Sequence, residues 1–205
     1  MSHIVLLGDS IFDNASYVPG EKPVIEQLKS LLPANTKASL LAVDGSVTGG
    51  VASQLKRLPS GATDLVLSVG GNDAIQCRGQ IYQAKTAEAL LKTLTTIRLA
   101  FSSGYTGLLD SLAAKQLPVT VCTVYNAIPG LQEHEKTLLS IFNDIIVLES
   151  ARRGFLVIDL RLVCTEQEDY SVVSAIEPSA KGGMKICRAI INVYFTKERI
   201  SSSNS

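Results

Sequence analysis

Aromatic residues are scarce in this chain of 205 residues, which contains no tryptophan, six tyrosines and five phenylalanines. It also lacks an excess of one charge, because 19 lysines and arginines balance 19 aspartates and glutamates. Nucleic-acid-binding modules need a basic surface, and those for single strands also need aromatic stacking platforms. The composition therefore argues against a nucleic-acid partner, whereas a hydrophobic fraction of 46% is enough for a mainly aliphatic core.

Long hydrophobic runs and closely spaced cysteines are missing too. No apolar run reaches the roughly 18 residues of a membrane span, and Met1–Leu7 lacks the basic start of a signal peptide. The four cysteines, at positions 77, 122, 164 and 187, are too far apart for a zinc knuckle or a redox motif. We therefore expect free thiols, no metal or cofactor, no membrane span and a cytoplasmic location.

Short apolar runs alternate along the chain with longer segments of helical periodicity. The predicted strands are Ile4–Leu7, Ala38–Val43, Asp64–Val69, Val119–Val124 and Phe155–Ile158. Predicted helices cover 22–32, 83–101 and 133–151, and a further helical pattern resumes at Leu108 after a break at Ser102–Gly104.

This alternation predicts the α/β class, with a flavodoxin-like three-layer α/β/α sandwich around a five-stranded parallel sheet. No linker or repeat divides the chain, so residues 1–198 are expected to form a single domain. The serine-rich segment 199–205 is expected to be a flexible tail. Ligands of such folds bind at the carboxyl ends of the strands, which directs attention to the loops there.

Polar, glycine-rich segments follow the first three predicted strands: Gly8–Ser10, Asp44–Gly50 and Gly70–Asp73. The Ser10 hydroxyl and N–H would be exposed in a turn, Gly45 would let a backbone N–H approach a ligand, and Asn72 would offer its amide. Three donors at one sheet edge suit a developing oxyanion in acyl transfer. Taken singly, each residue also has an ordinary structural role as a helix N-cap, a turn glycine or an Asx-turn.

In this order, the segments Gly8–Ser10, Gly45 and Gly70–Asp73 resemble blocks I, II and III of the SGNH hydrolases, the GDSL lipase/esterase superfamily. The resemblance covers nearly the whole chain. It implies that Ser10 is the nucleophile. It also implies that the Ser10 N–H, the Gly45 N–H and the Asn72 side chain form an oxyanion hole.

Block V departs from the family pattern of Asp-x-x-His-Pro-Ser followed by a small residue and a glycine. The matching stretch here is Ser174-Ala175-Ile176-Glu177-Pro178-Ser179-Ala180-Lys181-Gly182. The Pro-Ser-Ala and glycine positions are kept, but Glu177 stands at the histidine position and Ser174 at the aspartate position. The usual general base is therefore replaced.

Glu177 is the first candidate for that base, since a carboxylate can accept the serine proton. Its reference pKa is about two units below that of histidine. Burial would raise the pKa, whereas pairing with Arg161 would lower it. His134, which follows the loop after the fourth strand, is the second candidate, although its position at a helix start also fits a solvated surface residue. The other histidine, His3, lies roughly 16 Å from the carboxyl edge, and the last possibility is that no efficient base exists.

The leading functional hypothesis is a hydrolase of small carboxylic esters or thioesters that forms a Ser10 acyl-enzyme. Without a histidine, it should prefer activated leaving groups and work at an acid-shifted pH. The loops at 12–20, 75–84 and 126–133 are expected to line its acyl pocket.

Two other classes stay open. One is a hydrolase-fold protein that binds an acyl or carboxylate ligand without turnover. The other is a flavin- or nucleotide-binding domain, which the absence of a Gly-x-Gly-x-x-Gly or Walker spacing disfavours. The oligomeric state is left open by the sequence.

Overall fold

A computed structural model describes the backbone of residues 2–203 and the side chains of residues 2–196. Its centre is a sheet of five parallel strands in the order β2-β1-β3-β4-β5. The strands are β1 (Ser2–Gly8), β2 (Thr36–Leu40), β3 (Asp64–Ser68), β4 (Val119–Cys122) and β5 (Leu156–Ile158). This is the flavodoxin-like order, so the predicted fold class is confirmed.

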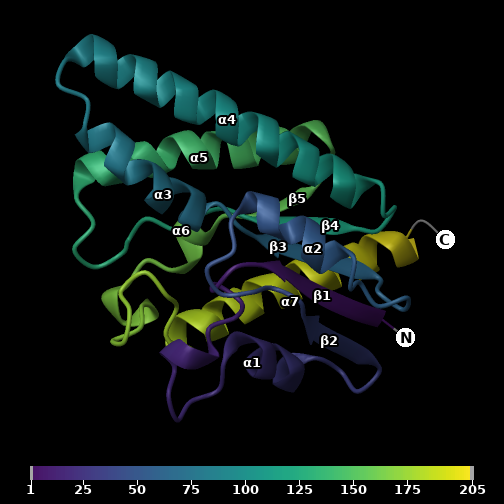
Figure 1. The fold of residues 1–205 in the computed structure, drawn as a ribbon. Helices are drawn as coiled ribbons and strands as arrows, with labels where there is room; N and C mark the ends of the chain where they lie inside the picture. Colours follow the sequence, from purple (N-terminus) through teal and green to yellow (C-terminus); the bar gives the residue numbers. More distant parts are fainter. Residues whose placement is uncertain (1, 204–205) are drawn as a thin grey trace.

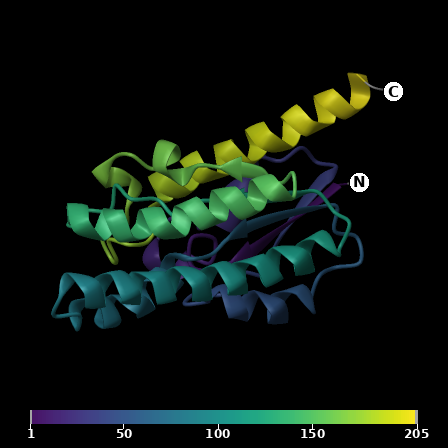
Figure 2. The ribbon, with the colours of Figure 1, turned by 90° about the horizontal axis from the view of Figure 1, so that it is seen from above.

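Helices cover both faces of the sheet (Figure 1). They are α1 (Val24–Leu31), α2 (Val51–Leu55), α3 (Gly71–Tyr82), α4 (Ala87–Ala113), α5 (Glu133–Arg152), α6 (Leu160–Val163) and α7 (Ala180–Ser203). Three short 3-10 turns are η1 (Ala15–Tyr17), η2 (Thr48–Gly50) and η3 (Gln167–Asp169). Helices α1 and α7 pack together on one face, and α4 and α5 lie side by side on the other (Figures 1 and 2).

Side chains of β1 alternate between two buried cores. Val5 and Leu7 belong to the core beneath α2, α4 and α5, whereas Ile4 and Leu6 belong to the core beneath α1 and α7. All four are essentially inaccessible to solvent. The sequence of the strand is therefore a continuous apolar run, as expected for a parallel sheet that is covered on both faces.

Strand β2 begins two residues earlier and ends three residues earlier than predicted. Beyond Leu40, the N–H groups of Leu41 and Ala42 both donate to the carbonyl of Leu6, at 2.9 and 3.0 Å. Two consecutive residues that share one acceptor interrupt the regular ladder. The apolar run continues past this point, so the sequence could not reveal the irregularity.

The predicted break at Ser102–Gly104 is wrong, because α4 continues through it from Ala87 to Ala113. Phe101 and Tyr105, on either side of the glycine, are both buried and belong to the same core cluster. Their burial outweighs the roughly 1 kcal/mol by which a glycine disfavours a helix interior.

Helix α3 was not predicted, and its residues 75–82 fall within a segment expected to be a loop. Only Ala74 is buried along it, so the helix lacks the apolar stripe from which amphipathic helices are recognised.

The last helix, α7, runs to Ser203, so most of the segment predicted as a tail from residue 199 has helical backbone. Residues 204 and 205 lie outside the described residues, and the single-domain boundary stays a prediction. In the part of the chain that the structure describes, no helix combines the length and apolar character that crossing a bilayer requires. All four cysteines carry free thiols, as expected.

Candidate active site

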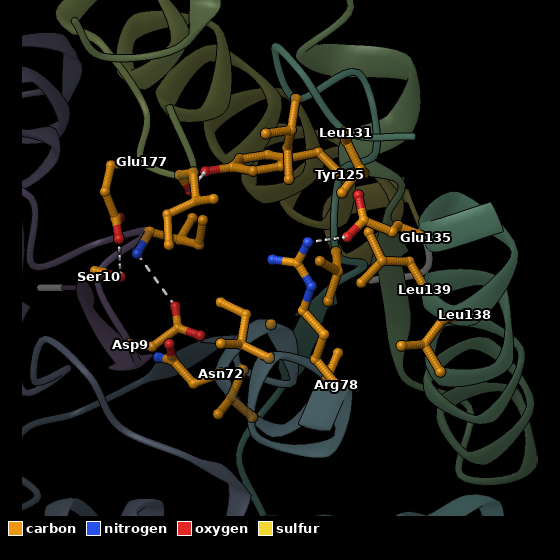
Figure 3. Close-up of a pocket in the computed structure, with 18 of the residues that line it drawn as sticks. Asp9, Ser10, Asn72, Arg78, Tyr125, Leu131, Glu135, Leu138, Leu139 and Glu177 are labelled. Atoms are coloured by element: carbon orange, nitrogen blue, oxygen red, sulfur yellow. Dashed lines mark hydrogen bonds and ion pairs between the residues drawn. The ribbon is translucent and has the colours of Figure 1, made fainter. Parts of the chain in front are cut away.

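A cavity of about 200 Å³ opens at the carboxyl ends of the central strands. Its wall is formed by the turn after β1, the whole length of α3, the loop after β4, the first turns of α5 and the segment at Ile176 and Glu177. Ser10, Asn72 and Glu177 lie together at one end (Figure 3). Apolar side chains from α3, α5 and the loop after β4 form most of the remaining wall.

Gly8 makes the turn that presents Ser10. Its φ is 124°, and a Cβ there would lie 1.7 Å from the carbonyl oxygen of Ser68 on β3. The buried Gln54 side chain accepts from the Gly8 N–H and donates to the Gly8 carbonyl, both at 2.8 Å. Immediately after Gly8, the Asp13 N–H donates to the Asp9 carbonyl at 3.2 Å and closes a single helical turn around Ser10.

Ser10 donates its hydroxyl hydrogen to Glu177, with Oγ and Oε1 3.0 Å apart (Figure 3). Both residues are buried. The Glu177 backbone is held on both sides, since its N–H donates to Ser174 at 3.0 Å and its carbonyl accepts from Ser171 at 2.8 Å. The hydroxyl thus has a carboxylate acceptor and does not serve as a helix cap. This separation lies within the range expected for a nucleophile and its base.

Burial raises the pKa of Glu177 to about 7, and the hydrogen bond from Ser10 offsets only part of that effect. The negative charge of Asp44 raises it slightly further. Arg161 does not act on Glu177, because its guanidinium pairs with Asp159 at 2.6 Å. The predicted alternative, in which Arg161 lowers the pKa, is therefore wrong. The second carboxylate oxygen, Oε2, is buried without a hydrogen-bond partner among the described residues.

Asp9 is a second buried carboxyl at this end of the cavity. It accepts a hydrogen bond from the Ile11 N–H at 3.1 Å through Oδ1. Burial raises its pKa to about 8, and the nearby carboxylates of Glu177 and Asp73 add to the rise. At neutral pH this side chain is therefore mostly protonated. In the sequence Asp9 stands out only as part of the Gly8–Ser10 motif, and no pattern there indicates its charge state.

Asn72 lies at the first turn of α3 and donates its side-chain Nδ2 to the carbonyl of Ser46 at 3.0 Å. Asp73 reinforces this contact, since its carboxylate accepts from the Thr48 N–H at 3.0 Å. The two bonds attach the start of α3 to the loop that contains Gly45. The Asn72 amide therefore bonds across to another strand end and does not close a local Asx-turn.

Gly45 follows β2 with a φ of 74°, a conformation that a side chain disfavours. It is not among the residues of the cavity wall, although its neighbour Ser46 is bonded to Asn72. The structure thus brings Ser10, Asn72 and Glu177 onto one cavity, and Gly45 is connected to it only through the bond between Ser46 and Asn72. The plain-turn interpretation of Gly45 is compatible with this position.

Neither histidine bonds to Ser10. His134 is exposed on the first turn of α5, where its Nε2 lies 3.2 Å from the hydroxyl of Tyr82. His3 lies near the start of β1, with its Nε2 2.8 Å from the hydroxyl of Ser39. The geometry thus favours Glu177 over His134 as the partner of the serine.

The cavity wall differs from the expected one. Residues 12–20 do not contribute to it, the segment 75–84 contributes as helix α3, and the loop at 126–133 contributes as expected. Sequence reasoning missed Arg78 and Glu135, which line the cavity and form an ion pair at 2.6 Å. Arg78 lies on α3, a helix that was not predicted, so no sequence pattern indicated this contact.

The fold and the site together define a class of α/β proteins with a serine at the first strand end and polar donors at the next two. No protein-family model matches the chain, and a comparison with curated proteins finds no match either.

Solved structures do match, and they include esterases and lipases. An extracellular lipase from Streptomyces rimosus has a TM-score of 0.67 and 20% identity, over 94% of this chain and 99% of the lipase. A lipase from a goat rumen metagenome has a TM-score of 0.70 and 20% identity, over 94% and 97%. A member of the lipolytic G-D-S-L family from Veillonella parvula has a TM-score of 0.66 and 16% identity, over 95% and 99%. The fold that the resemblance implied is thereby confirmed.

Proposed function

We propose that this protein is a serine hydrolase of carboxylic esters or thioesters, with Ser10 as nucleophile and Glu177 as general base. The 3.0 Å hydrogen bond between Ser10 Oγ and Glu177 Oε1, at the end of an apolar cavity, carries the proposal. The likeness of the fold to lipases and esterases supports it.

In the first half-reaction, Ser10 Oγ attacks the carbonyl carbon of the substrate while its proton passes to Glu177 Oε1. The carbonyl oxygen becomes an oxyanion. Collapse of this intermediate breaks the bond to the leaving group, which takes the proton back from Glu177. In the second half-reaction, Glu177 accepts a proton from water, the resulting hydroxide attacks the acyl-enzyme, and the proton returns to Ser10 as the acid leaves.

The oxyanion would be stabilised by the Ser10 and Gly45 N–H groups and by the Asn72 amide. Asn72 uses one of its two amide hydrogens on Ser46, and this contact fixes the plane in which the other hydrogen points. A pKa of about 7 leaves Glu177 roughly half ionised at neutral pH, which is close to the optimum for a general base.

A fluorophosphonate probe tests the proposal directly. The folded wild-type protein should acquire one adduct on Ser10, identified by peptide mass spectrometry, and Ser10→Ala protein should acquire none. The same preparations should differ in the release of p-nitrophenol from p-nitrophenyl butanoate. A folded wild-type protein with neither adduct nor turnover would exclude the hydrolase.

The Oε2 of Glu177 favours a second candidate, because no hydrogen-bond donor among the described residues holds this oxygen as a triad aspartate holds a histidine. In this alternative, the site binds an acyl or carboxylate ligand without turnover. Thermal stabilisation by octanoate, with turnover equally negligible in wild type and Ser10→Ala, would support it. Turnover that disappears in Ser10→Ala would eliminate it.

A further inference from the structure

An ion pair crosses the cavity between two helices. Arg78 from α3 and Glu135 from α5 both belong to the cavity wall, and their Nη2 and Oε1 atoms are 2.6 Å apart. Figure 3 shows the pair between the Ser10–Glu177 end and the α5 leucines, Leu138 and Leu139. A charged contact at this place is unexpected, because most of the surrounding wall is apolar.

The two partners are held very differently. The Glu135 side chain is only 14% exposed, and its Oε2 accepts from the Gln132 N–H at 3.0 Å in a capping box. The Tyr82 hydroxyl donates to Glu135 Oε1 at 3.4 Å. Arg78 is 61% exposed, and its only other described contact is with the ring of Tyr82, 5.6 Å from the centroid. Glu135 is therefore the fixed anchor, and Arg78 is free to turn into solvent.

The free-energy difference between the formed Arg78–Glu135 pair and a state in which Arg78 has turned into solvent is small. A partly exposed ion pair stabilises a protein by about as much as the burial of one further methylene group. An acyl chain that presses against the closed pair can therefore displace Arg78 once it is long enough to bury additional methylenes beyond it. Leu138 and Leu139 offer the apolar surface for those methylenes.

We propose that Arg78 and Glu135 form a gate that sets the length of the acyl chain that the cavity accepts. The inference rests on the proposed function, because it assigns the cavity to the acyl group of the substrate. An apolar cavity of about 150 Å³ can hold benzene, so the whole cavity of about 200 Å³, whose wall includes Leu138 and Leu139 beyond the pair, suits roughly six to eight acyl carbons. The part on the Ser10 side of the closed pair accepts shorter chains. Longer chains require the gate to open.

The first test compares acyl-chain profiles. Wild type, Arg78→Met and Glu135→Gln are assayed with p-nitrophenyl acetate, butanoate, octanoate and dodecanoate. Methionine keeps an apolar stem without the charge, and glutamine keeps an oxygen for the Gln132 N–H. Either substitution should raise the dodecanoate-to-butanoate ratio of kcat/KM by about tenfold, the lower end of the effect that one methylene group produces in an apolar pocket.

The Lys136–Glu133 pair provides the matched control. It lies on the same turn of α5, its atoms are 2.7 Å apart, and neither residue lines the cavity. Lys136→Met should leave the wild-type profile unchanged. An unchanged profile in folded Arg78→Met and Glu135→Gln would overturn the gate. A general loss at all chain lengths, without a change in the ratio, would overturn it as well.

A binding measurement separates failure of the gate from failure of the hydrolase. In the Ser10→Ala background, thermal shifts with octanoate and dodecanoate are compared with and without Arg78→Met. The gate requires the dodecanoate shift to increase relative to the octanoate shift when Arg78 is replaced. This result, together with a wild type that hydrolyses no ester, would reject the hydrolase and retain the gate. If the wild type hydrolyses esters and the dodecanoate shift relative to the octanoate shift is the same with and without Arg78→Met, the gate would be rejected and the hydrolase retained.

Discussion

At the Ser10 site, burial moves the titration of Glu177 into the range that a histidine normally covers. A pKa of about 7 lies close to the reference value of about 6.5 for histidine. An ordinary glutamate would give an acid-shifted pH optimum. With a pKa of about 7, we instead expect an optimum close to that of a histidine-based enzyme. A glutamate in the role of general base still differs from a histidine in charge, because a protonated carboxyl is neutral and would give an oxyanion no counter-charge. The polar donors around Ser10 must then supply more of that stabilisation.

Replacement of the base gives the first prediction. Glu177→Gln should lower kcat by about 10²- to 10⁴-fold, the usual contribution of general base catalysis. In wild type, kcat/KM should rise with pH through about 7, because only the ionised carboxylate accepts the Ser10 proton. This rising limb should be absent from the residual activity of Glu177→Gln. Initial rates between pH 5 and 9 provide the measurement.

His134 supplies the control for that prediction. Its Nε2 lies beside Tyr82 and not beside Ser10, so His134→Ala should retain the limb near pH 7. If His134→Ala lost the limb while Glu177→Gln kept it, the base would be assigned to the wrong side chain.

At the scale of elements, two glycines within helices differ in whether their positions tolerate a side chain. Gly104 is exposed in the middle of α4, and a Cβ there would meet only a methyl group of Thr48, at 4.0 Å. Gly182 lies in the first turn of α7, and a Cβ there would lie 2.0 Å from the carbonyl oxygen of Asp169. Close approach of two backbones requires a glycine only at the second position.

The second prediction follows from this contrast. Gly104→Ala should raise the free energy of unfolding by about 0.5–1 kcal/mol, because alanine loses less conformational freedom when the helix forms. Gly182→Ala should lower it by about 1–3 kcal/mol or more, because the backbone of Asp169 must move away. Urea unfolding followed by far-UV circular dichroism measures both. A destabilised Gly104→Ala protein would show that α4 depends on this glycine.

Buried apolar side chains at helical spacing made α1 and α5 predictable from the sequence, and their absence hid α3. The runs that form β1 and β3 were located to within two residues, because both faces of each strand are buried. Helix α3 buries only Ala74, so its pattern gave no signal. Helix α4 was divided at Gly104, since the sequence does not show that Phe101 and Tyr105 pack into the same core.

At the scale of the whole molecule, the order of the strands explains which parts of the site were predictable. Ser10 and Asn72 follow the adjacent strands β1 and β3, so the rule that ligands bind at strand ends brings them together. Glu177 could be placed only through the Pro178-Ser179 frame of the family resemblance. The pairing of Arg78 with Glu135 depends on packing between α3 and α5, which are distant in sequence, and no local pattern indicates it. Arg161 instead pairs with Asp159, only two residues away in the chain.

The dependence of stability on pH is a property of the whole molecule and gives the last prediction. Burial raises the pKa of Asp9 to about 8 and that of Glu177 to about 7, whereas both titrate near 4 in the unfolded chain. Between about pH 4 and these values, the folded protein binds more protons than the unfolded chain, so stability should fall as pH rises. His3 opposes this trend below about pH 6.5, because its pKa is lowered by burial.

Two variants separate the contributions of these carboxyls. Asp9→Asn keeps an oxygen for the Ile11 N–H but removes the titration, so its gain over wild type should grow up to about pH 8 and reach on the order of a few kcal/mol. The gain of Glu177→Gln should instead stop growing near pH 7. Urea unfolding at pH 5, 6, 7 and 8 measures each difference. Parallel stability curves for wild type and Asp9→Asn would mean that Asp9 is ionised in the folded protein, because only a carboxyl that stays protonated there makes the folded state bind the extra proton.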